Sequence, residues 1–258
     1  ADLISSRYGK SNTLGVIVTL LAIFGSTPYI ALQLQSLTLS FAVFTENSNT
    51  EYSSAIAALF IAAGLALFTI LFGTRNLDAN ERHHGVVTAI ALEAIVKLVA
   101  FISVGIFVVW GLSDGPSSIL NLMEKNIPVT DKVFSPRWVT LTFLSATAII
   151  CLPRMFQVIV VENSAEKHLA TASWAFPLYL LLMCIFVLPI AATGLNILPE
   201  GSNPDLFVLT IPLAENQGML AALAFLGGFS SATSMVIVAA IALSTMASNH
   251  IVLPLWLY

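Results

Sequence analysis

Residues 85–110 read GVVTAIALEAIVKLVAFISVGIFVVW, and Glu93 and Lys97 are the only charged residues in this stretch. A helix needs roughly 20 mostly apolar residues to cross about 30 Å of hydrocarbon, so the stretch is long enough to span a membrane. Backbone groups in lipid are satisfied only in helices and closed barrels. Barrel strands alternate between apolar and polar side chains, whereas this run is apolar on all faces. The stretch therefore predicts a transmembrane helix.

The composition of the whole chain extends this prediction. Hydrophobic residues make up 57% of the 258 residues and charged residues only 9%, and the mean hydropathy is +0.91. Soluble domains carry about 25% charged residues, so this composition excludes a soluble protein. Apolar runs recur along the chain, which a single signal peptide does not explain.

Six apolar runs are long enough to be spans. We therefore predict a single all-α transmembrane domain over residues 1–258, with about six transmembrane helices at 13–34 (continuing to 44), 54–72, 85–110, 139–161, 172–195 and 218–247. Cys151 and Cys184 lie inside these runs, and we expect both to be buried thiols rather than a disulfide.

Lysine and arginine in the short connections set the orientation. Basic residues precede the first span, lie between the second and third, and lie at the turn after the fourth, whereas the connections after the first and fifth spans are acidic. This pattern places the basic turns in the cytoplasm and predicts a multi-pass protein of the cell inner membrane. The proline-containing loop after residue 110 separates two groups of three spans that begin on opposite sides of the membrane, as two parts of an inverted-topology repeat do.

Glu93 and Lys97 are the most unusual polar residues because they are charged within a span. Their spacing of four puts them on one helix face, with the acidic residue first, the favourable order. An unpaired charge at mid-membrane costs about 2.5–3.5 kcal/mol on insertion scales, so both should face protein. Two hypotheses remain open: an ion or proton relay, or a neutralised structural pair that holds this helix against a neighbour.

Two further spans carry candidate solute-binding residues. Tyr29 and Gln33 share a helix face just after Pro28, where they could line a wet cavity or bond to neighbouring helices. Arg154 and Gln157 directly follow a proline in the fourth span. That pattern indicates either an opened turn with free carbonyls or a helix end with an arginine that reaches the interface.

The last span contains a dense group of small and hydroxyl residues at 227–235, among them Ser231 and Ser234. Small residues let helices approach closely, and hydroxyl and carbonyl oxygens are also ligands for a hard alkali cation such as sodium. Both interpretations stay open. The four histidines lie at turns or span ends, and neither a metal-spaced cluster nor a phosphate-binding glycine loop is present in the sequence. We therefore expect no catalysis in this segment, no bound cofactor and no nucleic-acid partner.

Several motifs in order along the chain resemble the sodium:solute symporter family. They are Ser6-Arg7-Tyr8-Gly9 before the first span, the stretch from Pro153 through residues 162–169, and residues 228–249. A narrower likeness is to the transporter-like N-terminal domain of CbrA-type sensor histidine kinases, carried by residues 82–85, 152–154 with 160–163, and 242–249.

The resemblance implies a leucine-transporter-like inverted repeat of five plus five helices. On that mapping the chain is a fragment that holds core helices three to eight. The cation site that the family builds on core helix eight maps to Ser231, Ser234 and Met235, and the methionine lacks the expected hydroxyl. The family's basic residue in core helix six is also absent, since Val158 stands at that position. These departures leave sodium and proton coupling both open.

Two functions follow from these observations. The first is a secondary-transporter module, coupled to sodium or protons, for a small polar organic solute such as an amino acid, with histidine among the candidates. The second is a transporter-like sensory input domain that acts on a kinase domain of the same chain in two-component signalling. The lipid bilayer and the small solute are the expected partners in both.

Overall fold

The computed structural model describes residues 1–45, 54–72, 84–126, 135–163 and 165–257. Of these residues 88% are helical and none lies in a strand, which confirms the all-helical prediction. The elements in chain order are α1 (Asp2–Arg7), α2 (Asn12–Thr45), α3 (Ser54–Phe72), α4 (His84–Ile106), η1 (Phe107–Leu112), α5 (Pro116–Asn126), α6 (Pro136–Cys151), α7 (Pro153–Phe156), η2 (Gln157–Val161), α8 (Lys167–Cys184), α9 (Val187–Ile197), η3 (Pro204–Leu206), α10 (Phe207–Ala214), α11 (Gly218–Ala247), η4 (Ser248–Val252) and α12 (Leu253–Trp256).

Four helical stretches of the described chain are long and apolar enough to cross a membrane. They are Asn12–Phe44, Val87–Leu112, Lys167–Ile197 and Gly218–Trp256, and they coincide with the predicted first, third, fifth and sixth spans. The last one runs beyond the predicted end at residue 247, because η4 and α12 continue α11 without interruption. The described helices thus support a membrane protein.

The predicted fourth span is broken in the middle. Pro136–Ile149 and Pro153–Val161 meet at an angle of 40°, and Leu152 between them is extended, with ψ 127°. The residue before a proline avoids the helical conformation, and proline itself offers no N–H to the preceding turn. If the two pieces form one span, the structure has up to five candidate spans.

The expected count of six spans is not confirmed. The second predicted span forms α3, and its apolar stretch Ile56–Leu71, counted over the described residues alone, is shorter than the four candidate spans. The acidic connection before the last span contains the short apolar helix α10. The short helix η3, which leads directly into α10, starts where the Asn203 side chain accepts a hydrogen bond from the Asp205 N–H at 3.0 Å, next to Pro204.

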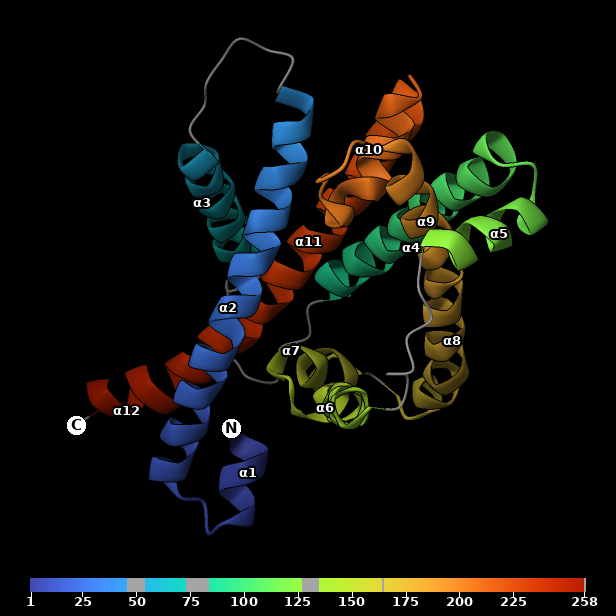
Figure 1. The fold of residues 1–258 in the computed structure, drawn as a ribbon. Helices are drawn as coiled ribbons and strands as arrows, with labels where there is room; N and C mark the ends of the chain where they lie inside the picture. The colour runs from blue at the N-terminus through green and yellow to red at the C-terminus, as the bar shows by residue number, and fades with distance from the viewer. Residues whose placement is uncertain (46–53, 73–83, 127–134, 164, 258) are drawn as a thin grey trace.

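Helix α11 lies at the centre of the fold, packed against α4 on one side and α2 on the other (Figure 1). The buried core gathers where α4, η1, α9, α10 and α11 meet, around Val104, Val108 and Ile211. The ring of Phe225 on α11 makes edge-to-face contacts with Phe41 and Phe44 on α2, at centroid separations of 5.0 and 5.2 Å. Contacts of this kind contribute about 0.5–1.5 kcal/mol each beyond simple burial, so they fix α2 against α11.

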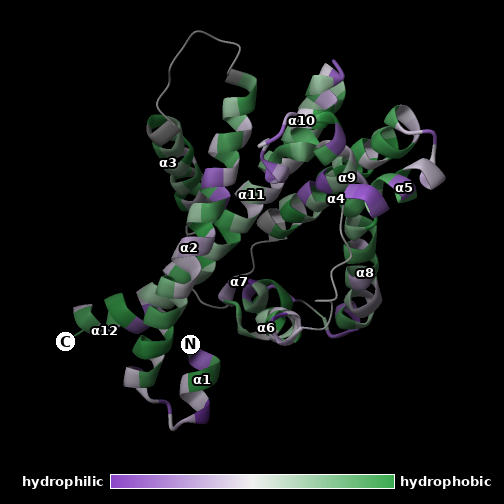
Figure 2. Cartoon of the chain, in the orientation of Figure 1, coloured by the Kyte–Doolittle hydropathy of each residue, from purple (hydrophilic) through white to green (hydrophobic). Residues whose placement is uncertain are grey.

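Large apolar side chains cover much of the outer surface. Phe24 on α2 is 74% exposed and Phe60 on α3 is 70% exposed, and Figure 2 shows apolar residues along much of α2, α3, α8 and α11. Such a surface suits lipid rather than water.

The prediction that Cys151 and Cys184 are buried was wrong: both thiols are free and lie on this exposed surface. Apolar surroundings in a sequence do not separate protein-facing from lipid-facing positions.

Two glycines permit close packing against phenylalanine rings. A methyl group added at Gly105 on α4 would overlap the ring of Phe186, and one at Gly194 on α9 would overlap the ring of Phe207.

Gly105→Ala is therefore expected to lower the free energy of unfolding by about 1–3 kcal/mol, as overpacking does. Gly64 on α3 faces open space, so Gly64→Ala should be neutral or stabilising by about 0.5–1 kcal/mol. Thermal unfolding in detergent measures both, and equal midpoints for the two variants would contradict the packing.

Candidate functional site

A cavity of about 470 Å³ lies between α4, α6, α7, α8 and α11. We call it the central cavity. Its walls are mostly apolar, and its polar side chains come from all five helices: Glu93, Lys97, Ser145, Arg154, Tyr179, Ser231 and Ser234. A concave, mainly apolar pocket with a few converging polar groups is the usual form of a small-molecule site. Five of the residues selected from the sequence thus meet at one place.

Glu93 connects α4 to α11 at the wall of this cavity. Its carboxyl group lies beside the Ser234 side chain, whose hydroxyl donates to the Ser231 carbonyl oxygen at 3.1 Å. The second carboxyl oxygen of Glu93, Oε2, is buried and has no hydrogen-bond partner. Burying such an oxygen without a partner is costly, so this atom is suited to accept a ligand.

The expected ion pair between Glu93 and Lys97 is not among the ion pairs of the described residues, although both side chains are described and half-buried. Helical spacing brought the two residues to one face, but the carboxyl group turns to Ser234 on the neighbouring helix. Lys97 lines the central cavity and also a second one. The side chains of Glu93 and Lys97 therefore both line the central cavity, but they form no ion pair with each other.

Arg154 and Tyr29, selected from different spans, are in direct contact. The Arg154 guanidinium donates a hydrogen bond to the Tyr29 hydroxyl, and its central carbon lies 4.1 Å from the centre of the Tyr29 ring. The Tyr29 hydroxyl is 2.6 Å from the Met235 sulfur, to which it donates. This chain of contacts links α7, α2 and α11, and Arg154 is the second residue of the short helix that begins after the break at Leu152.

Arg154 also separates the central cavity from a smaller one. The smaller cavity has a volume of about 60 Å³ and is lined by Ser26, Tyr29, Arg154 and Leu243, among others. Because Arg154 lines both cavities and bonds to Tyr29 between them, the Arg154–Tyr29 contact forms the boundary between the two spaces.

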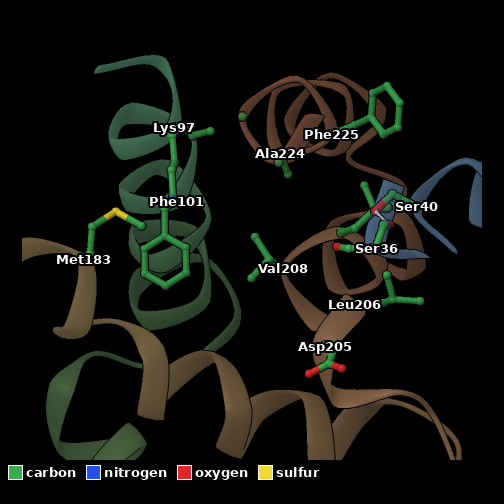
Figure 3. A pocket seen from close by; sticks show the side chains of 14 residues that line it. Ser36, Ser40, Lys97, Phe101, Met183, Asp205, Leu206, Val208, Ala224 and Phe225 are labelled. Carbon is green, nitrogen blue, oxygen red and sulfur yellow. Dashed lines mark hydrogen bonds between the residues drawn. The ribbon is translucent and has the colours of Figure 1, made fainter. Parts of the chain in front are cut away.

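The second cavity that Lys97 lines has a volume of about 200 Å³. We call it the Asp205 cavity. Figure 3 shows Phe101 of α4 and Val208 of α10 on opposite sides of it, Ala224 of α11 on a third side, and Asp205 of η3 at its edge. Ser36 and Ser40 of α2 complete its polar lining. Lys97 thus stands between the Asp205 cavity and the central cavity.

Comparisons with protein-family models, with curated proteins and with solved structures gave no match. The resemblance to the sodium:solute symporters therefore rests on the sequence motifs alone.

Three of the selected residues are outside the lining of the central cavity: Tyr29, which contacts it through Arg154, and the two amides Gln33 and Gln157. Gln33 is half-buried on α2 and does not belong to the lining of this cavity. Gln157 donates to the Glu162 carboxylate at 3.2 Å and lines a separate space of about 20 Å³. Sharing a helix face with Tyr29, or a turn with Arg154, was not enough to bring either amide to the site.

Tyr179 is a site residue that the sequence reading missed. Its hydroxyl on α8 donates to the Ala94 carbonyl oxygen on α4 at 3.2 Å, next to Glu93. Buried tyrosine hydroxyls usually find a partner, so a tyrosine in the middle of the apolar stretch 172–195 was the available signal.

Ser145 on α6 was also missed, since one serine in an apolar helix commonly bonds back to its own helix. Here it donates to the Leu141 carbonyl oxygen at 2.8 Å.

Proposed function

We propose that this chain is a secondary-transporter module for a small polar organic solute, an amino acid, coupled to sodium or protons. The observation that carries the proposal is the central cavity, where Glu93, Lys97 and Arg154 meet from two different helices. Uptake of labelled amino acids by the full-length protein in proteoliposomes tests it.

An amino acid fits the charges of the central cavity. Two cations, Lys97 and Arg154, match a carboxylate, and arginine does so with two parallel N–H donors. Glu93 offers its unpartnered Oε2 to an ammonium group or a cation. The apolar remainder of the wall, with Met155 and Phe176, suits the side chain of the solute. A zwitterion would offset the buried charges, which are expensive when unpaired.

The broken helix supports a transporter rather than a static bundle. Substrate sites in many transporters lie where transmembrane helices are interrupted. Here α6 and α7 are interrupted at Leu152, and both Leu152 and Arg154 line the central cavity. On this proposal the chain corresponds to core helices three to eight of a leucine-transporter-like inverted repeat.

The proposed topology follows the basic residues of the sequence. Arg7 and Lys10 precede α2, and Lys167 lies at the start of α8, which places these ends in the cytoplasm of a multi-pass inner-membrane protein. Asp205, Glu200 and Glu215 then face outward. The Asp205 cavity opens on the outer side in this arrangement.

A coupling cation would lie beside Ser234. The Ser231 carbonyl, the Ser234 hydroxyl and the free Glu93 oxygen are hard oxygen ligands close to one another, and hard cations prefer such ligands. Sodium bound there and a proton carried by Glu93 are the two forms of coupling that this chemistry allows.

Ser234→Ala is expected to raise the sodium concentration that gives half-maximal uptake, by about tenfold if one charge-assisted contact of about 1.4 kcal/mol is lost. Ser244→Ala is the matched control, because Ser244 lies on the same helix, is exposed and bonds only to the Ile241 carbonyl at 3.0 Å. A sodium titration of uptake distinguishes them. Identical curves for the two variants would remove Ser234 from the cation site.

The alternative is a sensory input domain, and Met235 favours it. The position expected to supply a hydroxyl to a cation supplies a sulfur instead, and this sulfur already accepts a hydrogen bond from Tyr29. A module with a weakened cation site could bind solute and change shape without accumulating it. In that case added amino acid changes autophosphorylation of a kinase domain in the full-length protein, while proteoliposomes accumulate no label.

A further inference from the structure

The Asp205 cavity has the features of a binding site of its own. Lys97 on α4 and Asp205 on η3 supply opposite charges, and Ser36 and Ser40 on α2 supply hydroxyl groups. Ser40 donates to the Ser36 carbonyl oxygen at 2.8 Å, which leaves its own lone pairs available. Its volume of about 200 Å³ exceeds the roughly 150 Å³ that is enough for benzene, so a small amino acid fits.

The wall between the two cavities is built around Lys97. Gly227 on α11 packs here, and a Cβ atom at this position would lie 2.7 Å from the Ala100 Cβ and 3.4 Å from the Lys97 Cα. Only glycine allows α11 to approach α4 this closely, and the contact holds the backbone of Lys97 between the two spaces. No described residue forms an ion pair with Lys97. Its ammonium group therefore has no charged partner among the described residues, and Lys97 belongs to the lining of both cavities.

The rest of the Asp205 cavity is apolar. Phe101, Met183, Leu206 and Phe225 supply most of the wall, and Asp205 is exposed at the edge (Figure 3). A ligand with a carboxylate, an ammonium group and an apolar side chain meets a complementary group at each part. A simple anion would lack a partner for Asp205.

We propose that the Asp205 cavity is an entry subsite for an amino-acid zwitterion, whose carboxylate is taken by Lys97 and whose ammonium group is attracted by Asp205. This inference rests on the proposed transport function. Because Lys97 lines both cavities, the carboxylate keeps the same partner as the solute moves into the central cavity, where Arg154 becomes the second cation.

The test uses the full-length protein in proteoliposomes and a ¹⁴C-labelled mixture of the protein L-amino acids as the probe. Asp205→Asn is expected to raise KM about threefold, the effect of one exposed charge, with kcat unchanged. The increase should vanish in about 1 M potassium chloride, where the Debye length falls to about 3 Å. Ser36→Phe fills the cavity from α2 and should raise KM further. Glu200→Gln is the matched control, since Glu200 is exposed on the same connection and does not line the cavity.

Three small competitors test the ligand class: the zwitterion L-2-aminobutyrate, the anion butyrate and the cation propylamine. Only the zwitterion should inhibit uptake of the label, and Asp205→Asn should weaken this inhibition. If butyrate competes as well as L-2-aminobutyrate, the zwitterion assignment is wrong. If the unaltered protein accumulates label and both Asp205→Asn and Ser36→Phe behave like Glu200→Gln, the entry subsite alone is overturned. If the unaltered protein neither binds nor accumulates any label, the proposed function fails together with the subsite.

Discussion

Arg154→Gln is expected to raise the KM for solute uptake by about 30-fold or more. Arg154 lies in the wall of the central cavity, and the Tyr29 ring and hydroxyl hold its guanidinium in place. Removing one partner of a buried, hydrogen-bonded charge pair costs about 2–5 kcal/mol, and about 1.4 kcal/mol corresponds to a tenfold change in affinity. Initial uptake rates over a range of solute concentrations measure the change.

Two variants separate solute binding from support of the arginine. Arg137→Gln removes an exposed arginine at the start of α6 and should leave KM unchanged. Tyr29→Phe keeps the ring beneath the guanidinium but removes the hydroxyl that bonds to Arg154 and Met235. Its increase in KM should therefore be smaller than that of Arg154→Gln. If Arg154→Gln behaved like Arg137→Gln, Arg154 would not contact the solute.

Lys97→Met and Glu93→Gln are each expected to reduce solute uptake by about 30-fold or more, by the same loss of a charged partner. The coupling between their effects on the free energy of unfolding should not exceed about 0.5 kcal/mol, the size of an ordinary i, i+4 contact on a helix, because no ion pair joins the two residues in the described structure. Thermal or denaturant unfolding of the single variants and the double variant in detergent gives this coupling energy.

A structural pair would give the opposite pattern. Lys97→Met alone would then leave a buried charge without its partner and lose several kcal/mol, and the double variant would recover part of that loss. A coupling energy well above 0.5 kcal/mol, together with unchanged uptake for Glu93→Gln, would show that the two charges serve only to hold the helices.

The sequence predicted the long helices because their signal is local. An apolar run of sufficient length determines a membrane helix wherever its neighbours lie, so α2, α4, α8 and α11 appear near their predicted bounds. The break in the fourth span was also local, since Pro153 alone disfavours a helical Leu152. Length did not separate α3 from a full span, and α10 was missed because its eight residues are too few for a periodic signal.

The sequence predicted several residues of the site, but it did not predict which of them are in contact. A charge or hydroxyl inside an apolar run is conspicuous, which is how Glu93, Lys97, Arg154 and Ser234 were selected. Their partners depend on which helices are neighbours. The spacing of Glu93 and Lys97 on one helix suggested a pair, but the carboxyl group lies beside Ser234 on α11, because α4 packs against α11. The same reason applies to Tyr29 and Arg154, which are 125 positions apart in sequence.

The most direct test of the central cavity as a transport site is uptake of ¹⁴C-labelled amino acids into proteoliposomes that contain the full-length protein, with and without an inward sodium or proton gradient. The proposed function predicts that label accumulates above the external concentration when a gradient is imposed, that the gradient's collapse releases it, and that Arg154→Gln prevents accumulation. Label that never exceeds the level in protein-free liposomes under either gradient would contradict transport by this protein.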